Sequence, residues 1–115
     1  MAEVRVKRIY EEASPEDGRR ILVDRLWPRG VRKDRVDEWA RDLAPSNELR
    51  REFHGQETEF EEFEARYVVE LEDRSGELHE LLDSTSGRLT LLFASKNLER
   101  NNATVLAEVL RRLEP

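Results

Sequence analysis

Two short runs of the sequence are apolar at nearly every position, and they restrict the fold more than any other feature. The first is centred on Ile21-Leu22-Val23 and the second on Leu91-Leu92-Phe93. A strand that is apolar on both sides is typical of a parallel sheet, because both faces of such a sheet are covered. We therefore predict buried strands over residues 20–26 and 88–94 of an α/β protein.

The remaining apolar residues predict one more strand and several helices. Residues 4–10 begin with the period-two alternation of a strand, and residues 14–18 suit a single helical turn. Apolar residues spaced three or four apart predict a helix from residue 34 until Pro45, carrying Val36, Trp39, Ala40 and Leu43 on one side, and another from Ser46 that Gly55 ends. The same spacing predicts helices over residues 57–71, 76–83 and 102–113.

These elements predict one α/β domain over residues 1–115. Its expected core is a small, mainly parallel three-stranded sheet with helices on both faces. In such sheets ligands bind beyond the carboxyl ends of the strands, so that edge is where we expect a site.

The composition excludes several classes of protein. There is no cysteine, and therefore no disulfide, thiolate metal site or cysteine nucleophile. The net charge of −6 argues against nucleic acid as the partner of the whole surface. Residues 1–5 lack a hydrophobic run and no later stretch approaches membrane-spanning length, so we expect a cytoplasmic protein with no membrane contact.

Neither a metal nor a cofactor is expected. The two histidines, His54 and His79, fall on separate predicted elements, which gives no convincing transition-metal site. His54 suits the end of a helix, where the dipole favours a partly charged imidazole. No glycine-rich loop of a nucleotide-cradling pattern is present, so we expect no cofactor.

Two polar clusters follow the two apolar strands. Asp24 and Arg25 open the first, which continues to Gly30, and Ser95-Lys96-Asn97 is the second. If the strands are parallel, both clusters lie at the same edge of the sheet. Asp24 and Arg25 are the first charges after an apolar run, so at least one of them is partly buried and must be paired, hydrogen-bonded or shifted in pKa.

These clusters suit a site for an anionic or nucleotide-like small molecule. Arg25, Arg29 and Lys96 supply positive charge, and the amino end of the last helix, near Asn102, supplies backbone N–H groups. Asp24 would act as a general acid or base or would orient an arginine, and Trp27 would offer a stacking surface.

Two other interpretations remain open. In a purely structural one, Asp24 pairs with an arginine to fix a turn, Trp27 belongs to the core, and Asn101 or Asn102 caps a helix. In the other, the protein is a non-enzymatic regulatory module that binds protein or nucleic acid through the basic loop from Arg25 to Arg35. Whether the protein is an enzyme, which ligand it takes and its oligomeric state all stay open.

Four segments of the chain resemble a known family. They are residues 18–30 (GRRILVDRLWPRG), residues 39–46 (WARDLAPS) with Leu49-Arg50, the positions Phe63, Tyr67 and Glu70-Leu71, and residues 90–97 (TLLFASKN) with Asn101-Asn102-Ala103. The chain thereby resembles the YeaO-like family of prokaryotic proteins, a domain of unknown function (DUF 488). Some relatives carry a porphyrin methyltransferase label, which does not suit a chain this short without a glycine-rich cofactor loop.

The resemblance implies a set of site residues rather than a reaction. Beyond the clusters above it points to Trp39, Asp42, Ser46, Arg50 and Tyr67. Asn97 stands where the family more usually has aspartate, and an asparagine cannot ionise. The candidate catalytic residue is thus Asp24, no residue is assigned to a metal, and the candidate ligand-binding residues are Arg25, Trp27, Arg29, Arg50, Tyr67, Lys96, Asn97 and Asn102.

Overall fold

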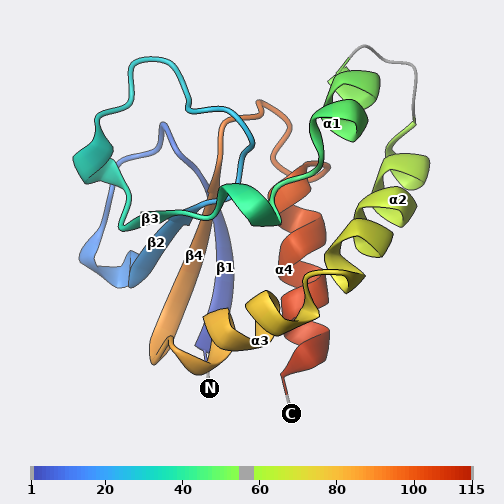
Figure 1. Ribbon diagram of the computed structural model, residues 1–115. Coiled ribbons are helices and arrows are strands. Elements are labelled where there is room, and N and C mark those ends of the chain that lie inside the picture. The colour runs from blue at the N-terminus through green and yellow to red at the C-terminus, as the bar shows by residue number, and fades with distance from the viewer. Residues whose placement is uncertain (1, 55–58, 115) are drawn as a thin grey trace.

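A four-stranded parallel sheet forms the centre of the protein in a computed structural model that describes residues 2–54 and 59–114 (Figure 1). Its strands are β1 (Ala2–Arg8), β2 (Arg19–Leu22), β3 (Glu38–Trp39) and β4 (Gly87–Phe93). They lie in the order β1-β4-β2-β3, and each neighbouring pair is parallel. The prediction of an α/β fold with a parallel sheet is confirmed, but the predicted number of three strands is wrong.

Four α-helices connect and follow the strands. They are α1 (Asn47–His54), α2 (Phe60–Glu72), α3 (Ser75–Asp83) and α4 (Asn102–Leu113), and single 3-10 turns occupy Pro15–Asp17, Lys33–Arg35 and Arg41–Leu43. The predicted helices over residues 76–83 and 102–113 are confirmed almost to the residue. The predicted exit at Gly55 and the start of the predicted helix at Glu57 lie outside the described residues.

The helix predicted from residue 34 until Pro45 is wrong. The 3-10 turns at Lys33–Arg35 and Arg41–Leu43 flank the short strand β3, in which Trp39 pairs with Leu22 of β2. Backbone hydrogen bonds from Asp37 N to Arg20 O and from Ala40 N to Leu22 O, both 2.8 Å long, continue this pairing on either side. Pairing with a distant strand therefore satisfies the backbone groups that a helix would have satisfied internally.

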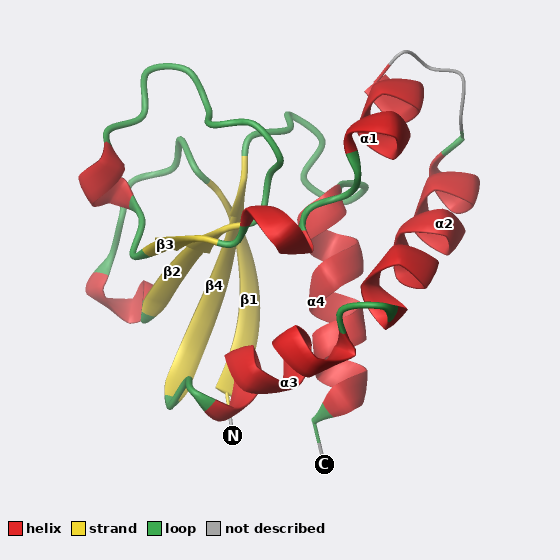
Figure 2. Ribbon diagram, in the orientation of Figure 1, coloured by secondary structure: helices red, strands yellow, loops and turns green. Residues whose placement is uncertain are grey.

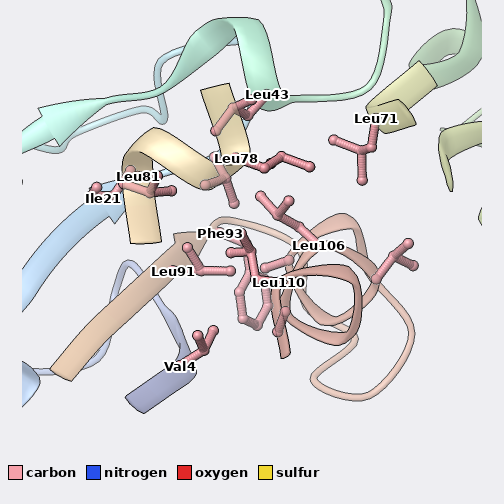
Figure 3. Packing of buried hydrophobic residues seen from close by; sticks show 14 of the residues in the cluster. Val4, Ile21, Leu43, Leu71, Leu78, Leu81, Leu91, Phe93, Leu106 and Leu110 are labelled. Atoms are coloured by element: carbon pink, nitrogen blue, oxygen red, sulfur yellow. The ribbon is translucent and has the colours of Figure 1, made fainter. Parts of the chain in front are cut away.

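All four α-helices pack on one face of the sheet, contrary to the prediction of helices on both faces. Side chains from the four helices and from alternate strand positions form the main core. Figure 3 shows Val4, Ile21, Leu91 and Phe93 of the strands against the helical residues Leu78, Leu81, Leu106 and Leu110.

The opposite face of the sheet is covered by loops rather than α-helices. Leu22 and Leu92 are completely buried there together with Ile9, which follows β1. The segment between β2 and β3 packs against them through Trp27, Val31, Val36 and Trp39. This segment, residues 23–37, can cover the face without an α-helix because the second core is small.

The carboxyl ends of the strands meet at one end of the molecule. Loops gather at this end, while the two described chain ends lie at the other (Figure 2). The backbone N–H of Ala2 donates to Glu114 Oε1 over 3.2 Å, which ties those chain ends together. Within residues 2–54 and 59–114, every helix is too short or too polar to cross a membrane.

Candidate functional site

A pocket of about 590 Å³ opens at the carboxyl ends of the strands. It lies where the sequence predicts a site, since residues after β1, β2 and β4 and residues of α1, α2 and α4 contribute to it. Its described lining comprises Arg8, Tyr10, Asp24, Arg25, Leu26, Trp27, Pro28, Arg29, Pro45, Arg50, Phe53, His54, Phe63, Ala94, Ser95, Lys96, Asn101 and Asn102.

Asp24 is half-buried and held by two hydrogen bonds. Its Oδ2 accepts from Ala94 N over 2.9 Å, and its Oδ1 accepts from Asn102 Nδ2 over 3.0 Å. Burial raises the pKa of Asp24, because desolvation disfavours the carboxylate more than these hydrogen bonds and the nearby His54 favour it. Asp24 therefore takes up a proton more readily than an exposed aspartate does.

Five basic side chains line the same pocket: Arg8, Arg25, Arg29, Arg50 and Lys96. Among the described residues, none of the five has a carboxylate partner within 4.0 Å, whereas many arginines elsewhere on the surface form ion pairs. The pocket therefore gathers unpaired positive charge in a protein whose net charge is −6. Such a local excess of cations is an electrostatic site for an anion.

Backbone carbonyls fix two of these arginines in place. Arg8 Nε donates to the carbonyls of Ala94 and Ser95 over 3.2 and 3.0 Å, and Arg25 Nε donates to Pro45 O over 3.1 Å. A carbonyl orients a guanidinium without neutralising it. Both guanidinium groups therefore keep their positive charge and have further N–H donors that a ligand can use.

Arg50 has a buried donor without a partner. Its Nε has no hydrogen-bond acceptor among the described residues, although the atom is shielded from solvent. An unsatisfied buried donor on a cation is costly, by about 1–3 kcal/mol or more. Arg29 and Lys96, in contrast, are exposed at the mouth.

Apolar and aromatic side chains form another part of the pocket wall. Phe53 of α1 and Phe63 of α2 stack with ring centroids 4.3 Å apart, and Pro45 lies in the same lining. Trp27 is both core and wall, because it packs edge-on against Trp39, donates through Nε1 to Val31 O and also borders the pocket. A flat apolar group could pack against this wall.

Of the nine site residues predicted from the sequence, seven contribute to the pocket lining. One of these seven, Asn102, also holds Asp24. The other two predicted residues do not line the pocket. Tyr67 is completely buried, and its hydroxyl donates to Leu43 O, so it holds the 3-10 turn Arg41–Leu43 from within the core. Burial, with the nearby Asp24 and Glu70, raises the pKa of Tyr67 well above its usual value.

Asn97 lies on the exposed loop after β4. Its Oδ1 accepts from the backbone N–H groups of Glu99 and Arg100, which forms a local turn. Of the further positions suggested by the resemblance, Trp39 Nε1 donates to Asp24 O over 2.7 Å and Ser46 donates to Glu70. Asp42 is exposed beside α3. These residues support the site or lie away from it.

Sequence reasoning missed Arg8, Tyr10, Phe53 and Phe63 as lining residues. The Arg8 guanidinium lies 4.8 Å from the centre of the Tyr10 ring, and the Tyr10 hydroxyl donates to Arg29 O over 3.0 Å. Both residues end or follow β1, so a firm assignment of β1 as a parallel strand would have placed them here. His54, interpreted from sequence as a helix-end residue, also reaches the lining.

The basic loop from Arg25 to Arg35 uses several of its charges internally. Arg32 pairs with Asp34 over 3.0 Å, and Arg35 Nη2 donates to the carbonyls of Ile9 and Glu11. Arg25 faces Pro45, as described above. The loop is thus mainly a cover for the sheet, with Arg29 and Lys33 as its exposed basic residues outside any ion pair that the described residues form.

No group of three or more His, Asp or Glu side chains within residues 2–54 and 59–114 is arranged to hold a metal ion. The fold and pocket define a small parallel α/β protein with basic side chains at the carboxyl edge of its sheet. Comparison with known families then shows which one it is: residues 3–114 match the family described as "Inactive DUF488-N3 subclade", and the chain belongs to that family.

Relatives of similar length share the family. The chain is 44% identical over 113 residues to uncharacterized protein YeaO of Escherichia coli (strain K12), covering 96% of this chain and 98% of the relative. It is 50% identical over 111 residues to uncharacterized protein Rv3073c of Mycobacterium tuberculosis (strain ATCC 25618 / H37Rv), covering 93% of this chain and 92% of the relative. The resemblance to YeaO-like proteins is thereby confirmed. No solved structure matches the chain significantly.

Proposed function

We propose that the protein binds a small anionic, nucleotide-like molecule in the pocket at the carboxyl edge of the sheet. The observation that carries this proposal is the set of five basic side chains that line the pocket without a carboxylate partner among the described residues. A bound phosphate or carboxylate group would compensate this positive charge.

The size and walls of the pocket support a ligand larger than an inorganic ion. Its volume of about 590 Å³ falls within the range of roughly 300–1,000 Å³ typical of small-molecule sites. The partly exposed ring of Phe53, backed by the buried ring of Phe63, suits a flat, apolar part of the ligand. An anionic group joined to a planar ring satisfies both parts of the lining.

Binding without turnover is the form of this function that we favour. The family description carries the word inactive, and both carboxylate oxygens of Asp24 already accept hydrogen bonds from the protein. Asp24 then acts as an oriented acceptor rather than as an acid or base. The cytoplasm, which the sequence suggests, stays the predicted location.

A thermal-shift and calorimetric screen tests the proposal. The panel contains inorganic phosphate, ribose 5-phosphate and nucleoside monophosphates. A ligand at about one hundred times its Kd stabilises the folded state by about 2.7 kcal/mol, which raises Tm by on the order of ten degrees in a domain of this size. We expect such a shift with at least one phosphorylated compound.

Variants at the pocket mouth locate the site. Arg29→Ala and Lys96→Ala remove exposed cations of the lining, so each should weaken binding by about tenfold while leaving Tm of the unliganded protein nearly unchanged. Arg112→Ala, at an exposed position in the last turn of α4, is the matched control. Equal binding by all three variants would place the ligand elsewhere, and no shift with any compound would refute the proposal.

The alternative, a module that binds nucleic acid through the loop from Arg25 to Arg35, gains little from the contacts of that loop. It stays a prediction that the same screen addresses when short oligonucleotides are included. Oligonucleotide binding that falls steeply with salt and is lost in Lys33→Ala would favour it over the small-molecule site.

A further inference from the structure

Asp24 differs in chemistry from the rest of the pocket lining. Among the described lining residues it is the only carboxylate, whereas Arg8, Arg25, Arg29, Arg50 and Lys96 can only donate hydrogen bonds. The pocket thus combines one strong, negatively charged acceptor with several cationic donors. A simple anion would use the donors and would be repelled by Asp24.

The carboxylate of Asp24 is oriented but not saturated. Each of its oxygens can accept two hydrogen bonds, and the structure gives one to each, from Asn102 Nδ2 and Ala94 N. These two bonds fix the plane of the carboxylate. The remaining acceptor capacity belongs to a half-buried group that lines the pocket, so it is available to a ligand.

The ligand must therefore match three features at once: the cations, the flat apolar wall of Phe53 and Phe63, and the acceptor at Asp24. We propose that the ligand is a nucleoside monophosphate whose base carries an exocyclic amino group, and that Asp24 accepts a hydrogen bond from that group. The phosphate meets the arginines, the planar base packs on the aromatic wall, and Asp24 selects the base. This inference rests on the function proposed above and adds its specificity.

Selection follows from what a keto base would present to Asp24. A carbonyl oxygen in place of the amino group brings lone pairs against the carboxylate and supplies no donor. A site that holds a charged acceptor for a ligand donor rejects an analogue without that donor, and the lost hydrogen bond to a charged group corresponds to a preference of about tenfold or more. Cytidine and adenosine monophosphates should bind more tightly than uridine and inosine monophosphates.

Calorimetric titration of the full-length protein with these four nucleotides measures the preference. We expect cytidine monophosphate to bind at least about tenfold more tightly than uridine monophosphate, and adenosine monophosphate more tightly than inosine monophosphate by a similar factor. In Asp24→Asn the preference should disappear or reverse, because the new amide can donate to a keto oxygen. Asp83→Asn, at the exposed end of α3, should keep the wild-type preference.

The outcomes separate this inference from the proposed function. Equal binding of amino and keto nucleotides by the wild type, with both weakened by Lys96→Ala, would overturn the selection by Asp24 and leave the anion site intact. Ribose 5-phosphate binding as tightly as the nucleotides would do the same. Failure of every phosphorylated compound to bind would overturn both. If Asp24→Asn does not fold, the wild-type ratios still decide.

Discussion

Asp24 and Asp17 are carboxylates whose surroundings shift their pKa values in opposite directions. Burial raises the pKa of Asp24, as described above. Burial alone would also raise the pKa of Asp17, but hydrogen bonds from Ser14 N, Lys7 and Arg20 outweigh it and lower that pKa. Asp17 thus belongs to an ionised cluster at the start of β2, while Asp24, beside the pocket, takes up a proton at a higher pH than an exposed aspartate does.

These opposite shifts predict opposite pH dependences of stability. Between pH 3.8 and its raised folded-state pKa, Asp24 binds more protons in the folded than in the unfolded protein, so its contribution to stability falls as pH rises through that window. Asp17, with a lowered folded-state pKa, contributes stability above pH 3.8 that is lost as pH falls through its folded-state pKa. Its contribution therefore grows with pH.

Urea unfolding of the wild type and of Asp24→Asn and Asp17→Asn, repeated in steps from acid to neutral pH, checks this. The difference in unfolding free energy between the wild type and Asp24→Asn should decline as pH rises and then level off. The corresponding difference for Asp17→Asn should increase with pH. If both differences in unfolding free energy changed with pH in the same direction, the assigned environments of Asp24 and Asp17 would be contradicted.

At the scale of elements, Gly18 lets β2 lie against β4. Its φ of +65° is unfavourable for residues with a side chain, and an added Cβ would lie 2.3 Å from the carbonyl oxygen of Arg88. Both constraints act on the backbone, at the residue before β2 and the second residue of β4. Gly76, the second residue of α3, has neither, because a Cβ added there would have no atom within 4 Å and its φ is ordinary.

Gly18→Ala and Gly76→Ala should therefore have effects of opposite sign. We expect Gly18→Ala to lower the free energy of unfolding by more than about 1 kcal/mol, since the backbone of β4 must move. Gly76→Ala should change it by between zero and about 1 kcal/mol in the stabilising direction, because alanine favours a helix. Thermal and urea unfolding measure both. A Gly18→Ala protein as stable as the wild type would show that β2 and β4 do not approach so closely.

The elements also show what the sequence could and could not predict. Residues 102–113 were predictable because their apolar side chains repeat with helical period behind an asparagine cap, and Asn101 does cap α4 by accepting from Thr104 N. The apolar side chains of residues 34–43 have the same spacing, although this segment forms no α-helix. Trp39 packs on the loop-covered face of the sheet and Ala40 on the helical face, and only the pairing with β2 reveals this.

The candidate site was predictable to the extent that it depends on parallel strands. Asp24 and Lys96 follow neighbouring parallel strands, so their meeting at one edge needed only the strand directions. Phe53 and Phe63 reach the same pocket from helices whose placement depends on tertiary packing. Local sequence contains no signal for that placement, which is why the aromatic wall was missed.

At the scale of the whole molecule, the strand order predicts a gradient of stability. β4 is paired on both sides, with β1 and β2, and is covered by core clusters on both faces. β3 is a two-residue edge strand paired only with β2. Amides that require global unfolding to exchange should therefore lie in β4, and amides released by local opening should lie in β3 and the loops.

Hydrogen exchange followed by NMR tests this gradient and connects it with the site. The amides of Leu91 and Leu92 should be among the slowest, and that of Ala40, just after β3, should exchange faster by about a hundredfold or more, because local opening costs far less than global unfolding. The exchange rate of the Ala94 amide should lie between those of Leu91 and Ala40, since Ala94 N donates to the side chain of Asp24 rather than to a strand. It should exchange faster in Asp24→Asn than in the wild type, while Leu91 stays unchanged if global stability is preserved. Slow exchange of Ala40 comparable with Leu91 would contradict the assigned edge position of β3, and an unaltered Ala94 would show that Asp24 does not hold the end of β4 at the pocket.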